Sequence, residues 1–323
     1  MTSESAGTII ALAGGVGGAK LADGLARLFG ERLTVVVNTG DDFTHLGLHV
    51  SPDLDTVMYT LAGIANPKAG WGIVGETWEF MAQIERLGGP AWFRLGDRDL
   101  ATHVLRTERL AEGETLSAVT AGLCRSLGVA AALLPMSDDL VRTMIRSDGG
   151  ELPFQDYFVR LACAVPVRGI RFEGAKTARI NPALAALGER PDLGAIIICP
   201  SNPYLSVDPI LAVPGMREWL RAQGRPIVAV SPIVGGAAIK GPAAKIMAEL
   251  GAAVSAVGIA RHYRGLIDGL VIDEADAGLA NEIVAEGIRV RVSRSVMSST
   301  EDRVALARVC LAFAGEIADG RCR

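Results

Sequence analysis

The sequence has no long apolar run, no basic run and no paired cysteine motif. None of its uninterrupted apolar stretches approaches the ~20 residues that a membrane-spanning helix needs. The opening residues, MTSESAG, have neither the basic region nor the apolar core of a signal peptide. We therefore expect a cytoplasmic protein that makes no contact with a membrane.

Charge and cysteine usage exclude further classes of protein. The net charge is −4 and Lys and Arg form no cluster, whereas nucleic-acid binding normally needs a basic face. We therefore expect no nucleic-acid partner. The cysteines have no CxxC spacing, which argues against a zinc site or a disulfide framework. We expect them to be reduced and mostly packed in the core: Cys124, Cys163, Cys199, Cys310 and Cys322.

What the sequence does contain is an alternation of short β-branched runs with helix-like segments. The runs are apolar throughout, as expected for strands buried on both faces of a parallel sheet. A chain of 323 residues can bury a large core. The pattern predicts an α/β fold with a Rossmann-like, doubly wound, mostly parallel sheet. The expected strands are Thr8–Ala13, Leu33–Asn38, Ala195–Cys199, Pro226–Val230 and Leu270–Asp273.

Two stretches interrupt this alternation. Residues near 65–130 have several helical signals and few strand signals, which predicts a helical excursion over the carboxyl edge of the sheet. Residues 136–190 are irregular and are predicted to form a small inserted lobe. The Rossmann-like nucleotide-binding core would then consist of residues 1–135 and 191–323. The apolar spacing of Glu301–Ala318 predicts a closing amphipathic helix.

Four glycines lie where the first predicted strand ends, in the sequence AGGVGGAK, just before a helix-like stretch that starts at Leu21. Glycine leaves no Cβ in the way of a phosphate, and a helix N-terminus favours an anion. The loop matches neither the P-loop pattern nor the dinucleotide pattern GxGxxG, and a tight βα turn would also explain it. We predict phosphate or nucleotide binding by Gly14, Gly15, Gly17, Gly18 and Lys20.

Acidic side chains follow the second predicted strand in two groups. Asp41 and Asp42 end the segment NTGDD, and Asp53 and Asp55 lie in SPDLDT, where a helix is predicted to start. Carboxylates at such positions suit magnesium (Mg²⁺), although Asp also caps helices and makes turns. Because capping already explains Asp53, we assign Asp42 and Asp55 as the catalytic residues and the Mg²⁺ ligands.

Further polar segments follow other strands or open helices. LGDRDLATH combines opposite charges with an imidazole that could clamp an anion, and PMSDD ends another apolar run. A lysine after the segment SPIVGG, Lys240 or Lys245, could neutralise a phosphate. The expected substrate-binding residues are Asp97, Arg98, His103, Ser137 and Asp138, and the expected nucleotide-binding residues at the sheet edge are Ser201, Asn202, Ser231, Gly235 and Gly236.

No Ser-His-Asp order and no Cys-His pair stands out in the sequence. Catalysis is therefore expected to rely on positioning and on the electrostatic effect of a metal, without an obligatory covalent intermediate.

Six segments, in the same order from about residue 8 to the last helix, together resemble the 2-phospho-L-lactate transferase family of coenzyme F-420 biosynthesis. They are GGVGGAK, NTGDD, SPDLDT, LGDRDLATH, PSNP and SPIVGG, and FQDYF resembles a short aromatic signature of the family. The resemblance implies transfer of a phospho-acyl unit from a guanosine diphosphate (GDP) conjugate to the deazaflavin Fo. The terminal hydroxyl of Fo would attack the phosphorus distal to guanosine and release GMP, with Mg²⁺ held by carboxylates such as Asp42 and Asp55.

The resemblance leaves several points open. The acyl part of the donor is lactyl, enolpyruvyl or glyceryl in the family, and no motif of the sequence indicates which of these applies. The guanine-reading residues and the residue that accepts the hydroxyl proton are not visible either. A related set of proteins with a similar opening binds uridine diphosphate sugars and acts as regulators without turnover, and this is the alternative function. The GDD and PDLD carboxylates favour the transferase. We expect a homodimer.

Overall fold

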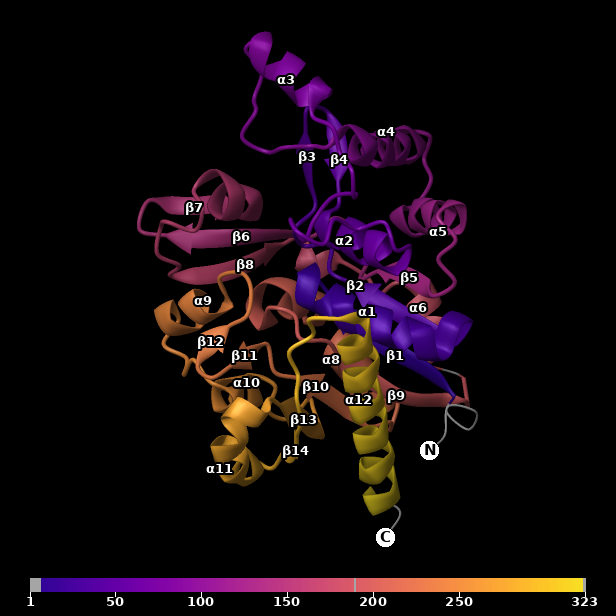
Figure 1. The fold of residues 1–323 in the computed structure, drawn as a ribbon, viewed down its shortest axis with the longest axis vertical. Coiled ribbons are helices and arrows are strands. Elements are labelled where there is room, and N and C mark those ends of the chain that lie inside the picture. The colour runs from indigo at the N-terminus through magenta and orange to yellow at the C-terminus, as the bar shows by residue number, and fades with distance from the viewer. Residues whose placement is uncertain (1–6, 189, 322–323) are drawn as a thin grey trace.

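The computed structural model describes residues 7–188 and 190–321 and is built around a seven-stranded sheet (Figure 1). The strand order is β14-β13-β10-β9-β1-β2-β5, and every neighbouring pair is parallel. The predicted doubly wound parallel sheet is therefore confirmed, and the five predicted strands agree with the structure to within two residues. The strands are β1 (Thr8–Ala13), β2 (Leu33–Val37), β5 (Ala132–Pro135), β9 (Leu193–Ile198), β10 (Ile227–Val230), β13 (Gly269–Ile272) and β14 (Arg289–Val292).

Helices cover both faces of the sheet, which is why its inner strands are apolar throughout. In β1, Ile9 and Ala11 pack on one face, whereas Ile10 and Leu12 pack on the other. The first face is covered by α1 (Gly15–Phe29), α2 (Pro52–Leu61), α5 (Leu116–Ser126) and the closing helix α12 (Thr300–Arg321), which packs along α1. The second is covered by α6 (Pro182–Leu187), α7 (Asp208–Leu211), α8 (Met216–Ala222), α9 (Ala243–Glu249), α10 (Ala256–His262) and α11 (Ala280–Ala285).

Helix α1 begins six residues earlier than the sequence indicated, at Gly15 and not at Leu21. Gly14 is its N-cap in an extended conformation, and the carboxylate of Asp53 accepts a hydrogen bond from the Gly15 N–H. Glycine disfavours a helix interior, but it is tolerated at the start of a helix, where the Gly15 N–H is met by a side chain. The glycine-rich segment is thus the first turn of the helix and not a loop before it.

The predicted helical excursion lies beyond the carboxyl edge of the sheet and contains a short hairpin as well. The hairpin joins β3 (Phe43–His45) to β4 (Leu48–Val50), and the helices are α3 (Glu79–Arg86) and α4 (Asp97–Ala111), followed by α5. Figure 1 shows this part at the top, above α2. It has a small core of its own around Val50, Met81 and Leu95.

The stretch expected to be irregular contains a three-stranded antiparallel sheet, in the order β7-β6-β8. Its strands are β6 (Arg142–Ser147), β7 (Gly150–Pro153) and β8 (Gly169–Glu173). Arg142 and Arg146 are exposed while Thr143 and Ile145 are buried, so β6 has the alternation of a one-sided strand and lacks the apolar run of a core strand. The boundaries proposed for an inserted lobe stay a prediction.

No helix within residues 7–188 and 190–321 combines the length and the apolar character needed to span a membrane. Of the cysteines in this part of the chain, Cys124, Cys199 and Cys310 are buried and Cys163 is half-buried, and none forms a disulfide. Cys322 and residues 1–6, which carry the start of the chain, lie outside the described residues.

Candidate functional site

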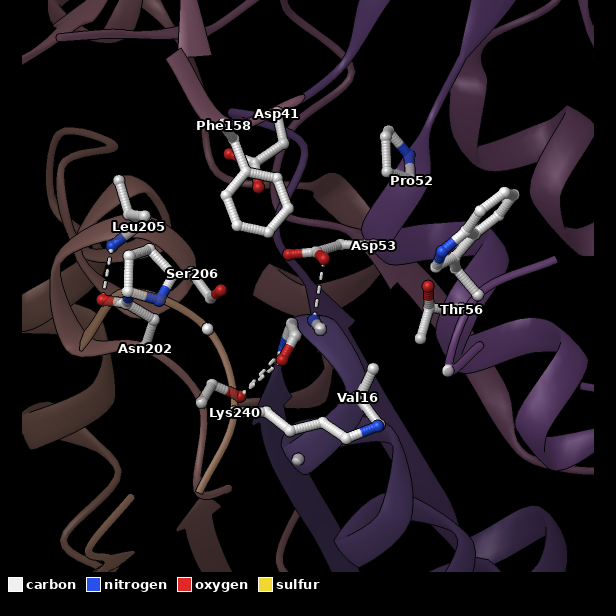
Figure 2. Close-up of a pocket in the computed structure, with 18 of the residues that line it drawn as sticks. Val16, Asp41, Pro52, Asp53, Thr56, Phe158, Asn202, Leu205, Ser206 and Lys240 are labelled. Atoms are coloured by element: carbon white, nitrogen blue, oxygen red, sulfur yellow. Dashed lines mark hydrogen bonds between the residues drawn. The ribbon is translucent and has the colours of Figure 1, made fainter. Parts of the chain in front are cut away.

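A cavity of about 590 Å³ opens at the carboxyl ends of β1 and β9. The chain runs from β1 outward to β2 and β5, and β9 then returns to the other side of β1, so the strand order reverses at this point. Ligands of open α/β sheets bind at such a reversal. The cavity is lined by the starts of α1 and α2, by the loop after β9, by segments of the excursion and by residues 239–243 and 295–297 (Figure 2).

The glycines of α1 let the helix pack directly on the loop after β9. A Cβ on Gly17 would collide with the carbonyl oxygen of Pro200, and one on Gly18 with the hydroxyl of Ser201. A Cβ on Gly14 would collide with the carboxylate of Asp53. Gly14, Gly15 and Gly17 line the cavity, whereas Gly18 is buried against the loop. Close packing therefore explains these glycines in addition to any role in binding.

Asp41 and Asp53 form an acidic pair in the cavity wall. Asp53 accepts hydrogen bonds from the Gly15 N–H at 2.7 Å and from Asn38 Nδ2 at 2.9 Å, and burial raises its pKa to about 6. Burial and the charge of Asp53 raise the pKa of Asp41 well above its ordinary value. Asp41 Oδ1 has no hydrogen-bond partner among the described residues. Figure 2 shows both side chains in the wall of this cavity. The pair thus brings two buried carboxylates together, and either a proton or a cation would offset their mutual repulsion.

Asp42 and Asp55, the residues chosen from the sequence, have other partners. Asp42 accepts a hydrogen bond from Ser51 Oγ at 2.7 Å, faces His49 Nε2 at 3.2 Å, and lines a separate, smaller cavity. Asp55 lines the main cavity, but both of its oxygens bind the guanidinium of Arg106. Their assignment as metal ligands and catalytic residues stays a prediction, and the structure draws attention to their neighbours Asp41 and Asp53.

A second cluster in the same wall has the spacing of a metal site. Asp55, Asp99 and His103 offer ligand atoms that all lie within 4.8 Å of one another. Arg106 Nη1, however, lies 3.1 Å from Asp55 Oδ2 and 3.3 Å from His103 Nδ1. A fixed positive charge therefore already occupies this cluster, and a cation fits it less well than it fits Asp41 and Asp53.

Two lysines line the cavity. The Lys20 ammonium donates to the carbonyl of Met297 at 2.7 Å, and burial followed by the charge of Arg303 lowers the pKa of Lys20. Lys240 is exposed, and its side chain extends over the start of α1 toward Val16 (Figure 2). Lys245 lies elsewhere, bound to the Val165 carbonyl and to Glu249.

Of the residues predicted after β9 and β10, three line the cavity. The hydroxyl of Ser201 accepts from the Gly14 N–H and donates to the Gly14 carbonyl, and Asn202 Oδ1 accepts from the Tyr204 and Leu205 N–H groups. Ser231 hydrogen-bonds the backbone of Ile233. These contacts shape the loops, and all three residues lie within reach of a ligand.

The remaining predicted residues do not line the main cavity, and each has a structural contact. Gly235 and Gly236 have φ values of +57° and +76° and turn the hairpin between β11 (Ile233–Val234) and β12 (Ala237–Ala238). Asp97 accepts hydrogen bonds from the first N–H groups of α3, and Arg98 donates one to the Val74 carbonyl. Ser137 donates a hydrogen bond to the Arg179 carbonyl, and Asp138 accepts one from the Ser117 N–H. His103, by contrast, is buried in the cavity wall.

The aromatic side chains that line this cavity had no predicted role. Phe154 and Phe158 stack with their ring centroids 5.2 Å apart and their planes 17° apart. On the excursion side, Trp71, Trp92 and Phe93 also line the cavity. The FQDYF segment and the tryptophans near 71 and 92 were the available signals. Such side chains suit the faces of a planar ring system.

The sequence comparisons with known proteins agree on one family, and the structural comparison shows the fold. Residues 9–307 match the family described as 2-phospho-L-lactate transferase CofD. A phosphoenolpyruvate transferase of Streptomyces griseus is 44% identical over 317 residues, covering 96% of this chain and 99% of the relative. A 2-phospho-L-lactate transferase of Methanosarcina mazei is 40% identical over 304 residues, covering 93% and 98%. A UPF0052-family protein of Bacillus halodurans, at 14% identity, shares the fold with a TM-score of 0.59 over 94% of this chain and 99% of that one.

Proposed function

The chain belongs to the 2-phospho-L-lactate transferase CofD family, and on this premise we propose that it transfers its phospho-acyl unit from a GDP conjugate to the deazaflavin alcohol Fo, releasing GMP. Membership makes it a transferase of a phospho-lactate or phosphoenolpyruvate unit in coenzyme F-420 biosynthesis. The greater identity to a phosphoenolpyruvate transferase favours the enolpyruvyl form of the donor.

One observation carries the proposal. A single cavity combines a helix N-terminus, the Asp41–Asp53 pair and an aromatic wall. The first turn of α1 offers backbone N–H groups to a diphosphate. The aromatic side chains suit the planar deazaflavin, and a cavity of about 590 Å³ is in the range of small-molecule sites.

Magnesium fits the Asp41–Asp53 pair. Mg²⁺ prefers one or two carboxylates plus phosphate oxygens and waters, and Asp41 Oδ1 is a buried oxygen that lacks a partner among the described residues. When bound there, Mg²⁺ would offset the negative charge of the diphosphate. Lys20 and Lys240 would add positive charge on the side of α1. The aromatic wall would hold the ring of Fo and exclude water from the reacting groups.

The proposed reaction is tested by incubating the protein and Mg²⁺ with Fo and, separately, with the enolpyruvyl, lactyl and glyceryl GDP conjugates. We expect a more acidic fluorescent deazaflavin and an equal amount of GMP, most rapidly with the enolpyruvyl donor. Chromatography with fluorescence detection measures both. Absence of product with all three donors, together with thermal stabilisation by a uridine diphosphate sugar, would contradict the proposal and support the regulatory alternative.

The stabilisation of the protein by Mg²⁺ is expected to increase with pH. Asp53 has a pKa of about 6, so below that pH a proton competes with the cation for its carboxylate. The rise in Tm on adding Mg²⁺ should be small at pH 5 and nearly complete at pH 7.5, as measured by differential scanning fluorimetry. Asp53→Asn should abolish the rise in Tm on adding Mg²⁺, because it removes one of the two proposed carboxylate ligands. Equal shifts at both pH values would place the cation away from Asp53.

A further inference from the structure

Asp99 is a carboxylate of the cavity wall that forms no ion pair with an arginine or a lysine among the described residues. It lies in the first turn of α4 and is 7% exposed. Its Oδ1 accepts a hydrogen bond from the hydroxyl of Tyr59 at 2.7 Å. No described residue hydrogen-bonds to its other oxygen, Oδ2. Of the carboxylates that line the cavity within the described residues, Asp55 is neutralised by Arg106, and Asp41 and Asp53 form the proposed cation site.

The neighbours of Asp99 hold its carboxylate in place. Arg106 Nη1 lies 3.3 Å from His103 Nδ1, and because a guanidinium can only donate, Nδ1 accepts and the imidazole proton lies on Nε2. His103 Nε2 lies 3.3 Å from Asp99 Oδ1. Burial alone would raise the pKa of Asp99, but His103 and Tyr59 outweigh it and bring the pKa below its ordinary value. The carboxylate is thus ionised at neutral pH.

The position of Asp99 suits the hydroxyl end of an acceptor. The same excursion supplies Trp92 and Phe93 to the cavity wall, followed by Asp99 and His103. An acceptor whose planar ring rests on the aromatic side chains would extend its polar chain along this wall. Asp99 also lies within 4.8 Å of Asp55, which shares the first turn of α2 with Asp53. The carboxylate therefore lies in the same cavity wall as the aromatic side chains and close to the first turn of α2.

We propose that Asp99 accepts the proton of the attacking hydroxyl and that Tyr59 and His103 are the positioning residues of its carboxylate. The inference rests on the proposed function. The hydroxyl proton moves to Asp99 Oδ2, and the hydroxyl oxygen forms the new bond to the phosphorus distal to the nucleoside. The bond from that phosphorus to the bridging oxygen breaks, and its electron pair stays on the leaving nucleoside monophosphate. Asp99 then returns its proton to the solvent.

Asp99→Asn tests this role, because the amide keeps the size of the side chain and an acceptor for the Tyr59 hydroxyl but takes up no proton. With the full-length protein, Mg²⁺, Fo and the enolpyruvyl donor, kcat should fall about 10²–10⁴-fold. KM for Fo should stay within about threefold, as expected for a group that acts in the chemical step. Asp99→Glu should recover part of kcat, and Tyr59→Phe should lower kcat about tenfold with little change in KM.

Three results would overturn the inference. The first is a kcat for Asp99→Asn within threefold of the wild type. The second is a raised KM for Fo at unchanged kcat, which would limit Asp99 to binding. The third is an equal loss of kcat in Asp99→Glu with a marked fall in Tm, which would make the role structural. A wild-type protein that forms no product with any donor would overturn the proposed function itself, a result distinct from these three.

Discussion

Asp55→Asn is expected to lower the free energy of unfolding by about 3–5 kcal/mol. The substitution leaves the guanidinium of Arg106 buried without a counter-charge, since Arg106 is 1% exposed and both oxygens of Asp55 bind it. Removing one partner of a buried ion pair costs much more than the pair itself contributes. Equilibrium unfolding in urea, monitored by fluorescence and circular dichroism, measures the change.

The double variant Asp55→Asn/Arg106→Gln is the matched control. It removes both charges and leaves two amides that can hydrogen-bond, so it should regain more than half of the lost stability. If Asp55 served as a metal ligand with no structural role, Asp55→Asn would unfold like the wild type in the absence of Mg²⁺. The double variant would then be no more stable than the single one. The stability measurement thus distinguishes the metal-ligand role that the sequence predicts for Asp55 from its structural role as the partner of Arg106.

Asp41→Asn is expected to stabilise the metal-free protein and to lower kcat/KM about 10³-fold. Burial and Asp53 raise the pKa of Asp41 above its unfolded value, so ionised Asp41 disfavours the folded state as the pH rises above that value. Asparagine removes this penalty, and a gain of about 1 kcal/mol would raise Tm by about 2 °C. The loss of activity follows because an amide is a poor Mg²⁺ ligand.

Differential scanning fluorimetry at pH 7.5 without Mg²⁺, together with the product assay, measures both effects of Asp41→Asn. Asp148→Asn is the control, because Asp148 is exposed in the turn between β6 and β7 and is paired with Arg168. Both Tm and kcat should stay near wild type. An Asp41→Asn protein that is less stable and fully active would contradict the assignment of Asp41 to the cation site. Like charges that are held together for function commonly lower the stability of a protein while they support its activity.

The central sheet could be predicted because its strands are buried on both faces and their sequences are apolar without interruption. The strands that the sequence analysis missed have a different pattern. In β14 the sequence Arg-Val-Arg-Val belongs to an edge strand, and in β6 exposed arginines alternate with buried residues. Exposed and buried residues alternate in such strands with a period of two, and this alternation is difficult to recognise in a strand of only four to six residues.

The sequence grouped the candidate residues at one edge of the sheet but could not choose among the carboxylates. Motifs at the ends of strands meet at one edge of a parallel sheet, so the glycines and aspartates could be placed there together. Asp41 and Asp42 are adjacent in sequence, yet one lines the main cavity and the other a separate cavity. Asp55 is committed to Arg106, 51 residues away in sequence. Which carboxylate is neutralised depends on partners that are distant in the sequence, and a local sequence pattern does not predict such partners.

The contact between the first turn of α1 and the loop after β9 joins segments 187 residues apart, through the hydrogen bond from Gly14 to Ser201. A ribosome adding about 5–20 residues per second needs about 10–40 s to cover that interval. Throughout this time β1 is already made but lacks β9, the strand that pairs with its second edge. The cavity therefore takes shape late in synthesis. An amino-terminal fragment that ends before Ser201 carries most of the acidic residues of the site but cannot assemble it.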